Sequence, residues 1–191
     1  MAAIPLPSQE YLRECFAYNP HTGALIWRWR PRGHFVSVGA WRSWNARMGG
    51  AEADRIRADG KYRRAAINDQ SFLSHRIIWK MMTGEDAPLI DHADRDGTNN
   101  KWLNLRKATG HQNNLNSSVR KSNVTGLKGV TKRRSRYIAQ IKIKEKTIYL
   151  GMYQTAEAAH AAYCKAARNA FDEFWVDGSA TAKNGSGPFD R

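Results

Sequence analysis

A polar stretch between Leu89 and Asn114 constrains the fold of this chain more than any other part of the sequence. It reads LIDHADRDGTNNKWLNLRKATGHQNN and holds five Asn, three Asp and two His in 26 residues. LID is a short apolar run typical of a strand, and ADRDGTNN is rich in turn residues. WLNLRKAT follows as a second strand, and GHQNNLN begins a helix. The stretch therefore predicts a β-loop-β-α unit.

The spacing of the acids argues against a calcium loop here. If Gly97 took the sixth position of an EF-hand loop, His92 would take the first and Leu103 the twelfth, where that loop needs an aspartate and a bidentate glutamate. A structural zinc ion needs about four N or S ligands. His92 and His111 have no cysteine or third histidine near them in the sequence. We therefore expect neither a calcium loop nor a structural zinc site.

The order of the polar residues resembles that of the HNH nuclease family, most closely the phage and intron-encoded homing endonucleases. Asp91 and His92 end the first strand, Asn104 lies in the NLR of the second, and Asn113 lies on the helix. A helix with His-Arg, SHRIIW, often precedes this motif in such proteins. The resemblance implies a ββα-metal core with Asp91 and Asn113 as metal ligands, His92 as general base, and Asn104 as the member of the catalytic set that supports the loop.

The chemistry of phosphodiester hydrolysis fits these residue types. A hard cation, Mg²⁺ first and Mn²⁺ second, takes oxygen ligands such as those of Asp91 and Asn113 and leaves positions open for phosphate and water. Side chains alternate along a strand, so His92 points away from Asp91 and can approach the attacking water. An imidazole with a pKa near about 6.5 suits a general base at neutral pH.

Neighbouring residues leave alternatives open. Asn114 adjoins Asn113, so the ligand assignment is open by one residue. His111 is an exposed helix-cap histidine or a contact to DNA or metal. His75 lies on a helix beside Ile78 and Trp79, and we expect it to be buried for structural reasons.

The charge of the chain favours a polyanionic partner. Lys and Arg outnumber acids 31 to 17, a formal charge of 31 − 17 = +14. No apolar run is long enough to span a bilayer, and no secretory segment follows MAAIPLPSQE. Cys15 and Cys164 lack CxxC spacing. We expect double-stranded DNA as partner, with no membrane and no small-molecule cofactor, in the cytoplasm, and the resemblance implies phage encoding in a bacterial host.

A second, basic unit follows the polar stretch. YIAQIKI and TIYLGMY flank KEK as a hairpin, and TAEAAHAAYCKAARNAF is a helix capped by Thr155. One face of the first strand, with Ala139 and Ile141, is expected to pack on the helix, leaving an open face for a DNA groove. The predicted DNA-binding residues are Lys128, Lys132, Arg133, Arg134, Arg136, Gln140, Lys142, Lys144, Lys146 and Tyr149.

This second unit resembles the AP2 DNA-binding domain, a three-stranded sheet on one helix. The matching features are GV, an aromatic-x-Ala-x-Ile strand, LG-aromatic and T-x-E-x-A. Tyr137 stands where that family usually has tryptophan, which changes the expected groove geometry but not the fold.

The N-terminal third predicts mixed α/β structure without an equally specific motif. SQEYLRECFAY predicts a helix capped by Ser8, and ALIWRWR predicts a strand. RPRGHFVSVGAWRSWNARMGG is basic and tryptophan-rich; local burial of the rings is favoured over a surface arm on nucleic acid. SFLSHRIIWKMMTG predicts a helix that Ser71 caps and Gly84 ends.

Together these patterns predict an α+β chain with a ββα-metal core followed by a three-stranded antiparallel sheet on one helix. The predicted divisions are residues 1–68 of unassigned role, 69–120 as the nuclease, 121–178 as the DNA-binding unit, and 179–191 as a disordered tail. The predicted activity is metal-dependent hydrolysis of phosphodiester bonds in double-stranded DNA by a site-preferring nicking enzyme or a homing-type enzyme, with a monomer and nicking favoured. The alternatives are an inactive DNA-binding regulator on the same domains and a ribosomal-type RNA-binding protein.

Overall fold

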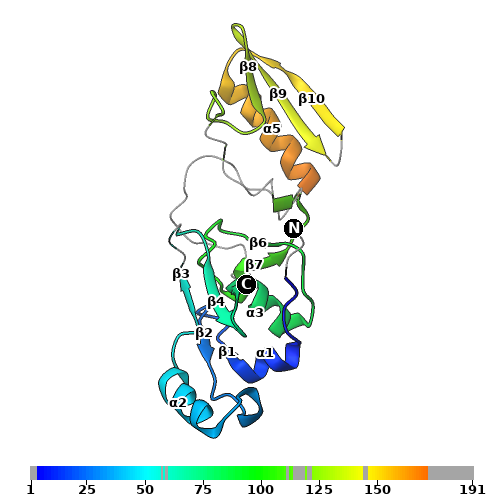
Figure 1. Cartoon of the computed structure of the whole chain (residues 1–191). Helices are drawn as coiled ribbons and strands as arrows, with labels where there is room; N and C mark the ends of the chain where they lie inside the picture. The colour runs from blue at the N-terminus through cyan, green and yellow to red at the C-terminus, as the bar shows by residue number, and fades with distance from the viewer. Residues whose placement is uncertain are drawn as a thin grey trace. The chain divides into compact units, whose positions relative to one another are not determined.

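The computed structural model describes residues 4–56, 58, 60–110, 112, 113, 119, 122–143 and 146–171. The chain divides into two compact units, residues 1–109 and residues 110–191, which we call the first unit and the second unit (Figure 1). No helix among the described residues is long and apolar enough to cross a membrane.

The first unit consists of short helices and strands. In chain order they are α1 (Gln9–Cys15), β1 (Phe16–Tyr18), β2 (Leu25–Trp27), the 3-10 helix η1 (Arg32–His34), α2 (Val38–Met48), β3 (Asp54–Ile56), β4 (Arg63–Ile67), β5 (Gln70–Leu73), α3 (Ser74–Thr83), β6 (Ile90–His92), the 3-10 helix η2 (Trp102–Asn104) and β7 (Leu105–Lys107). The strands form antiparallel sheets β1–β2, β3–β4–β5 and β6–β7.

One hydrophobic core joins the N-terminal region to the predicted nuclease region. The sequence predicted a division after residue 68, but β4 and β5 pair on either side of that position. Leu12 of α1 and Ile77 and Ile78 of α3 are fully buried in the same core. Buried apolar area drives the folding of both segments, so neither has a complete core alone. The core residues are Leu6, Leu12, Cys15, Phe16, Leu25, Trp27, Ala65, Ile67, Phe72, Ile77, Ile78, Met81, Ala87, Ile90 and Leu105.

Two of the predicted helix boundaries in the first unit are confirmed, and one is wrong. Ser8 caps α1, because its Oγ accepts a hydrogen bond from the Tyr11 N–H at 3.2 Å. Gly84 ends α3 in the left-handed conformation, with φ +80°. The prediction that Ser71 caps α3 is wrong. Ser71 lies in β5 opposite Ala66, and α3 begins only at Ser74.

The tryptophan-rich stretch forms η1 and α2, a helix that the sequence reading missed. Its N-terminal signal is Ser37, whose Oγ accepts from the Ala40 N–H at 3.1 Å. Local burial of the tryptophans in this stretch is correct for Trp41 and Trp44, which are partly buried. Trp29, which precedes the stretch, is 66% exposed.

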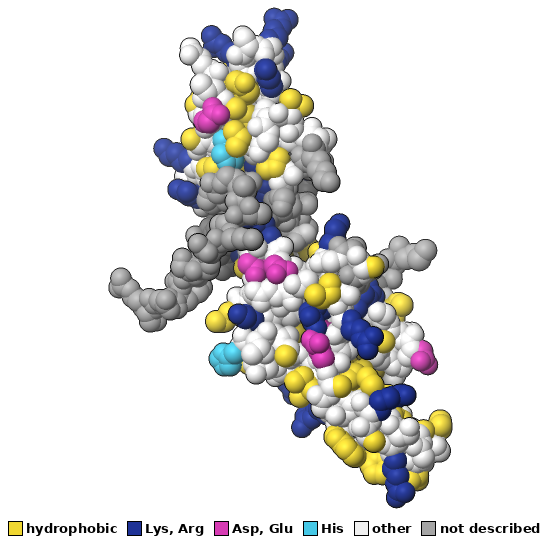
Figure 2. All heavy atoms as spheres, turned by 90° about the vertical axis from the view of Figure 1, so that its left-hand side faces the viewer, with side chains coloured by type: hydrophobic (Ala, Val, Ile, Leu, Met, Phe, Trp, Pro, Cys, Tyr) yellow, Lys and Arg dark blue, Asp and Glu magenta, His cyan; other side chains and the backbone are white. Residues whose placement is uncertain are grey.

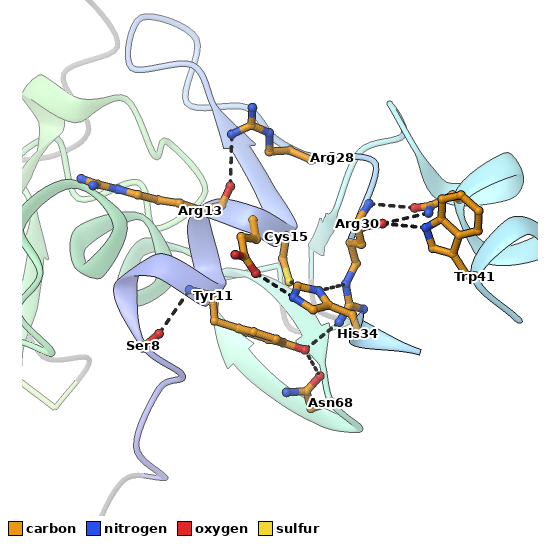
Figure 3. Close-up of polar contacts among 11 residues, drawn as sticks. Ser8, Tyr11, Arg13, Cys15, Arg28, Arg30, His34, Trp41 and Asn68 are labelled. Atoms are coloured by element: carbon orange, nitrogen blue, oxygen red, sulfur yellow. Dashed lines mark hydrogen bonds and ion pairs between the residues drawn. The ribbon is translucent and has the colours of Figure 1, made fainter. Parts of the chain in front are cut away.

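The buried Arg30 connects this helix to α1 (Figure 3). Its backbone carbonyl accepts hydrogen bonds from Trp41 Nε1 and Asn45 Nδ2 at 2.9 and 3.0 Å. Its guanidinium donates to Tyr11 Oη at 2.7 Å and to His34 Nδ1 at 3.2 Å. Because His34 Nδ1 accepts, Nε2 carries the ring hydrogen and donates to a Glu14 carboxylate oxygen at 2.7 Å. The N-terminal segments are thus joined by a continuous polar network.

The second unit is a three-stranded antiparallel sheet that packs on one helix. Its elements are β8 (Val130–Arg133), β9 (Arg136–Ile143), β10 (Lys146–Tyr153) and α5 (Ala156–Phe171), and the strand order is β10-β9-β8. The predicted hairpin is present, and so is the predicted cap, since the Ala158 N–H donates to Thr155 Oγ1 at 3.1 Å.

Small residues allow the helix and the sheet to pack closely. Ala139 and Ile141 of β9 are buried, as predicted, and pack with Ala159 and Tyr163 of α5. Gly129, just before β8, has φ +70°, and a Cβ there would lie 1.9 Å from the Tyr163 ring. This position therefore requires glycine for both its backbone angle and its space.

Candidate active site

The predicted motif begins on a fully buried strand. β6 pairs with β7 in the register Ile90 to Lys107, Asp91 to Arg106 and His92 to Leu105. Asp91 and His92 are each 5% exposed. Adjacent strand residues face opposite sides, so the two side chains have different neighbours. The apolar LID run has therefore placed two ionisable groups in the interior, where such groups need partners.

The partner of Asp91 is Arg106, which lies opposite it on β7. Arg106 Nε and Nη2 both donate to Asp91 Oδ2, at 2.9 and 2.8 Å. The side chains of Asp91 and Arg106 are 6% and 19% exposed. This ion pair keeps a carboxylate at the end of the strand, and it gives the arginine of the NLR motif a contact that the sequence reading did not assign.

The partner of His92 is a second polar residue in the interior, Asn100. His92 Nε2 lies 3.1 Å from Asn100 Oδ1, and Asn100 is 2% exposed. Two further rings surround the imidazole. The His75 ring is 5.0 Å from the His92 ring, centroid to centroid, and nearly perpendicular to it, while the Tyr62 ring is 6.1 Å away.

His75 is buried, as the sequence predicted. Its pKa is lowered to about 3, first because burial penalises the charged ring and then because His92 and Arg76 add positive charge nearby. The ring is therefore neutral at physiological pH. Its Nδ1 has no hydrogen-bond partner among the described residues.

Asn104 ties down the loop that connects the two strands. Its Oδ1 accepts from the Asp94 N–H at 3.0 Å, and its Nδ2 donates to Asp94 Oδ1 at 2.9 Å and to the Asn99 carbonyl at 2.7 Å. Asn104 lies at the end of η2, whereas the sequence predicted a strand at this position. The strand begins one residue later because residues 102–104 turn to bring this amide back to the loop.

The last residue of the predicted set is in the second unit. Asn113 and Gln112 have helical backbone conformation, and Asn113 is partly buried. His111 and Asn114, the alternatives to Asn113, lie outside the described residues, as does Lys144. The pairing of Asp91 with Asn113 on one metal ion stays a prediction.

The oxygen donors of this set suit a hard divalent cation. A carboxylate and a carboxamide provide the ligand type that Mg²⁺ takes, with water and phosphate completing the shell. Among the described residues, no three His, Cys, Asp or Glu side chains converge on a point where a metal ion could bind. Asp91 stays the carboxylate ligand that the sequence predicts for such a cation.

The predicted DNA-binding residues divide between two faces of the second unit's sheet. In register, Arg133 lies opposite Arg136, and Gln140 opposite Tyr149, on the face away from α5. Lys142 shares that face, opposite Thr147. By the same register, Lys132 and Lys146 belong to the face toward α5, where they are exposed at the edges. Lys128 precedes β8, and Arg134, with φ +55°, turns the chain between β8 and β9.

The surface charge of the second unit is strongly positive. Residues 122–143 and 146–171 hold nine Lys or Arg and one acid, Glu157 on α5, a net charge of 9 − 1 = +8. Figure 2 shows Lys and Arg side chains in dark blue standing out from this unit, with little acidic surface between them. Such an excess of positive charge over a single carboxylate attracts a polyanion to the described part of this unit.

Sequence reasoning missed Asn100, Arg106 and Tyr62 as neighbours of the motif. Asn100 belongs to a run of turn-forming residues, and nothing in that run marks it as buried. Gly97 was the sequence signal that could have indicated a close contact of this loop with another segment. A Cβ there would lie 2.1 Å from the Lys61 carbonyl oxygen, so glycine lets the loop touch the segment that carries Tyr62.

The comparison with known families matches one segment of the chain. Residues 72–115 match the model of an HNH endonuclease family, a segment that runs from β5 past Asn113 and includes Asp91, His92 and Asn104. A comparison with curated proteins finds no match. The match supports an HNH nuclease core in this segment, and with it a nuclease that acts on DNA.

Proposed function

We propose that this chain is a divalent-metal-dependent endonuclease that hydrolyses phosphodiester bonds in double-stranded DNA. The observation that carries the proposal is the buried Asp91–His92 pair at the end of β6, inside the segment that matches the HNH endonuclease model. Burial of two ionisable groups is costly, and such groups concentrate at functional sites.

Each residue of the set has a proposed role. Asp91 and Asn113 hold the cation, most favourably Mg²⁺ with Mn²⁺ as a substitute, and Asn104 keeps the intervening loop in place. When bound, the cation neutralises charge on the phosphate and on the leaving oxygen. Arg106 holds the Asp91 carboxylate at the strand end.

His92 is the proposed general base. It takes a proton from a water molecule whose oxygen forms the new bond to phosphorus. The bond between phosphorus and the 3′ oxygen breaks, and the proton ends on that oxygen. The products are a 3′-hydroxyl and a 5′-phosphate. A positioned base of this kind contributes about 10²–10⁴-fold to the rate.

The second unit is the proposed DNA-binding module, and its AP2 resemblance is part of the proposal. The exposed Arg133, Arg136 and Lys142 lie on the sheet face away from α5 with Gln140 and Tyr149. Arg and Lys bind phosphates and guanine edges, and a sheet of this kind fits the major groove. This module would supply affinity and site preference, as in a homing-type phage enzyme.

One centre per chain predicts nicking. The two strands of a duplex run antiparallel, so a monomer must release and turn over to cut the second strand, whereas a two-fold dimer presents two centres at once. We propose that the monomer nicks one strand first.

The test is incubation of purified protein with supercoiled plasmid in Mg²⁺, in Mn²⁺ and with chelator. Open circles should accumulate first with either metal, and the chelator should abolish them. DNA binding without cleavage in both metals would contradict the proposal and favour the inactive DNA-binding regulator. Linear product without open circles, at concentrations where sedimentation shows a dimer, would contradict nicking by a monomer.

A further inference from the structure

We infer that Asn100 is a positioning residue that fixes the tautomer and ring orientation of His92, and that the β1–β2 turn of the N-terminal region holds Asn100 in place. The inference rests on the proposed nuclease function, because it concerns the proposed base. It assigns a role to residues 16–27, for which the sequence predicted none.

The hydrogen bond between the two side chains determines the tautomer. Asn100 Oδ1 carries no hydrogen and can only accept, so at 3.1 Å it requires the hydrogen of a neutral His92 ring to be on Nε2. Nδ1 is then the ring nitrogen with the lone pair, and it is the atom that would take the proton from water. Loss of the amide oxygen would allow the other tautomer, in which Nδ1 carries the hydrogen and cannot take a proton from water.

The surrounding rings restrict rotation of the imidazole. His75 packs nearly perpendicular to His92 at 5.0 Å, and Tyr62 lies 5.6 Å from His75 and 6.1 Å from His92. His75 is neutral at physiological pH, because burial lowers its pKa to about 3. These rings limit the tilt of the imidazole, and the Asn100 bond selects which nitrogen faces the interior.

The position of Asn100 depends on the N-terminal region. Tyr18 Oη donates to the Asn100 carbonyl oxygen at 2.8 Å. The Trp102 N–H donates to the Pro20 carbonyl at 2.9 Å. Gly23 has φ +79°, and a Cβ there would lie 2.8 Å from the Asn100 carbonyl carbon. The β1–β2 hairpin thus contacts the backbone of Asn100 through Tyr18 and Gly23, and that of the nearby Trp102 through Pro20, from a segment about 80 positions earlier in the chain.

The test begins with the tautomer itself, measured on the full chain without metal or DNA. In ¹⁵N-histidine spectra recorded above the titration of the rings, with His92 assigned by a His92→Gln variant, the wild type should show hydrogen on Nε2. Asn100→Leu should lose that signature, and Asn100→Asp, which keeps an oxygen acceptor of similar shape, should retain it. Hydrogen on Nδ1 in the wild type would overturn the inference, even where a variant fails to fold.

Cleavage under single-turnover conditions gives the second readout. Asn100→Leu should lower the rate by about 10²-fold, the size of effect expected from a misplaced group, while DNA affinity stays within twofold. Asn100→Asp should recover most of the rate. Equal rates for the wild type and Asn100→Leu would overturn the inference.

A matched pair of tyrosine variants tests the N-terminal support. Tyr18→Phe removes the hydroxyl that binds Asn100, whereas Tyr11→Phe removes one that binds Arg30 and Asn68. Tyr18→Phe alone should lower the cleavage rate, and equal effects of both would overturn the role of the turn. If the wild type cuts no DNA, the proposed function fails while the tautomer result still decides the positioning of His92.

Discussion

The two units differ in whether polar and charged side chains are buried. All eight buried polar or charged residues among the described part of the chain lie in the first unit: Arg30, Asn45, Asp54, Ser74, His75, Asp91, His92 and Asn100. The buried residues of the second unit are Val130, Ala139, Ile141, Ala159, Tyr163 and Ala167, and its cations are at the surface.

This difference separates two tasks. A buried polar group must be held by specific partners, which fixes its geometry and suits chemistry. An exposed cation binds phosphate with less geometric demand and suits affinity. The comparison therefore predicts that changes in the first unit alter the cleavage rate, whereas changes on the open sheet of the second unit alter DNA binding.

The largest expected effect is on His92. His92→Ala should lower the single-turnover cleavage rate by about 10²–10⁴-fold, because the proposed base is lost, and leave DNA affinity nearly unchanged. His21→Ala is the control, since His21 is an exposed turn residue of the same unit. Retention of the wild-type rate by His92→Ala would end the assignment of this residue as the base.

Two glycines of the second unit allow a matched stability test. Gly126 and Gly129 have φ +68° and +70°, so alanine is strained in both. A Cβ at Gly129 would also overlap the Tyr163 ring, whereas nothing lies within 4 Å of one at Gly126. Gly129→Ala should therefore be the less stable variant by about 1–3 kcal/mol, the usual range for overpacking.

Hydrogen exchange of the β9 amides measures this difference within the second unit. Protection of β6 and α3 in the first unit should not change. Equal exchange in the two glycine variants would show that α5 and β8 pack less closely than described.

The pH dependence of stability should carry a contribution from His75. Its pKa in the folded protein, about 3, is below the ordinary value of 6.5, so the unfolded chain binds the proton more strongly. Stability from this group is complete above pH 6.5 and falls as the pH decreases toward 3, by at most about 1.4 kcal/mol per pH unit. The free energy of unfolding, measured with urea at several pH values across this range, should change less with pH in His75→Gln than in the wild type. In His21→Gln it should change with pH as in the wild type.

The smallest expected effect is that of one sheet lysine. Lys142→Ala should reduce the slope of log affinity against log salt by about 0.9, the value for one lost phosphate contact. Lys165→Ala is the control, because Lys165 is an exposed residue of α5. An equal slope in the two variants would place DNA elsewhere than on the open face.

Local patterns predicted several elements of the secondary structure, whereas α2 and the strands β3, β4 and β5 were missed. The strand at Ile90–His92, the β9–β10 hairpin, the Ser8 and Thr155 caps and the inner face of β9 each depend on residues close in sequence, where period and capping rules apply. Residues 72–115 also match the predicted HNH family.

What the sequence did not reveal depends on contacts between distant segments. The burial of Asn100 and its bond to Tyr18 join positions 82 residues apart, and Leu6 binds Asp86 across 80 residues. Turn-forming residues such as Asn100 are usually exposed, so their local pattern concealed a buried role. For the same reason the division predicted after residue 68 missed the shared core of the first unit.

The central claim is that the first unit performs cleavage and the open sheet of the second unit binds DNA. It is tested most directly by measuring the dissociation constant for DNA and the cleavage rate of two variants on one plasmid substrate. His92→Ala should keep the wild-type dissociation constant for DNA and lose the cleavage rate at saturating protein. The combined variant Arg133→Ala, Arg136→Ala and Lys142→Ala should bind DNA more weakly and, once saturated, cleave at the wild-type rate. A combined variant that binds normally but cleaves slowly, or a His92→Ala variant that cleaves normally, would contradict the account.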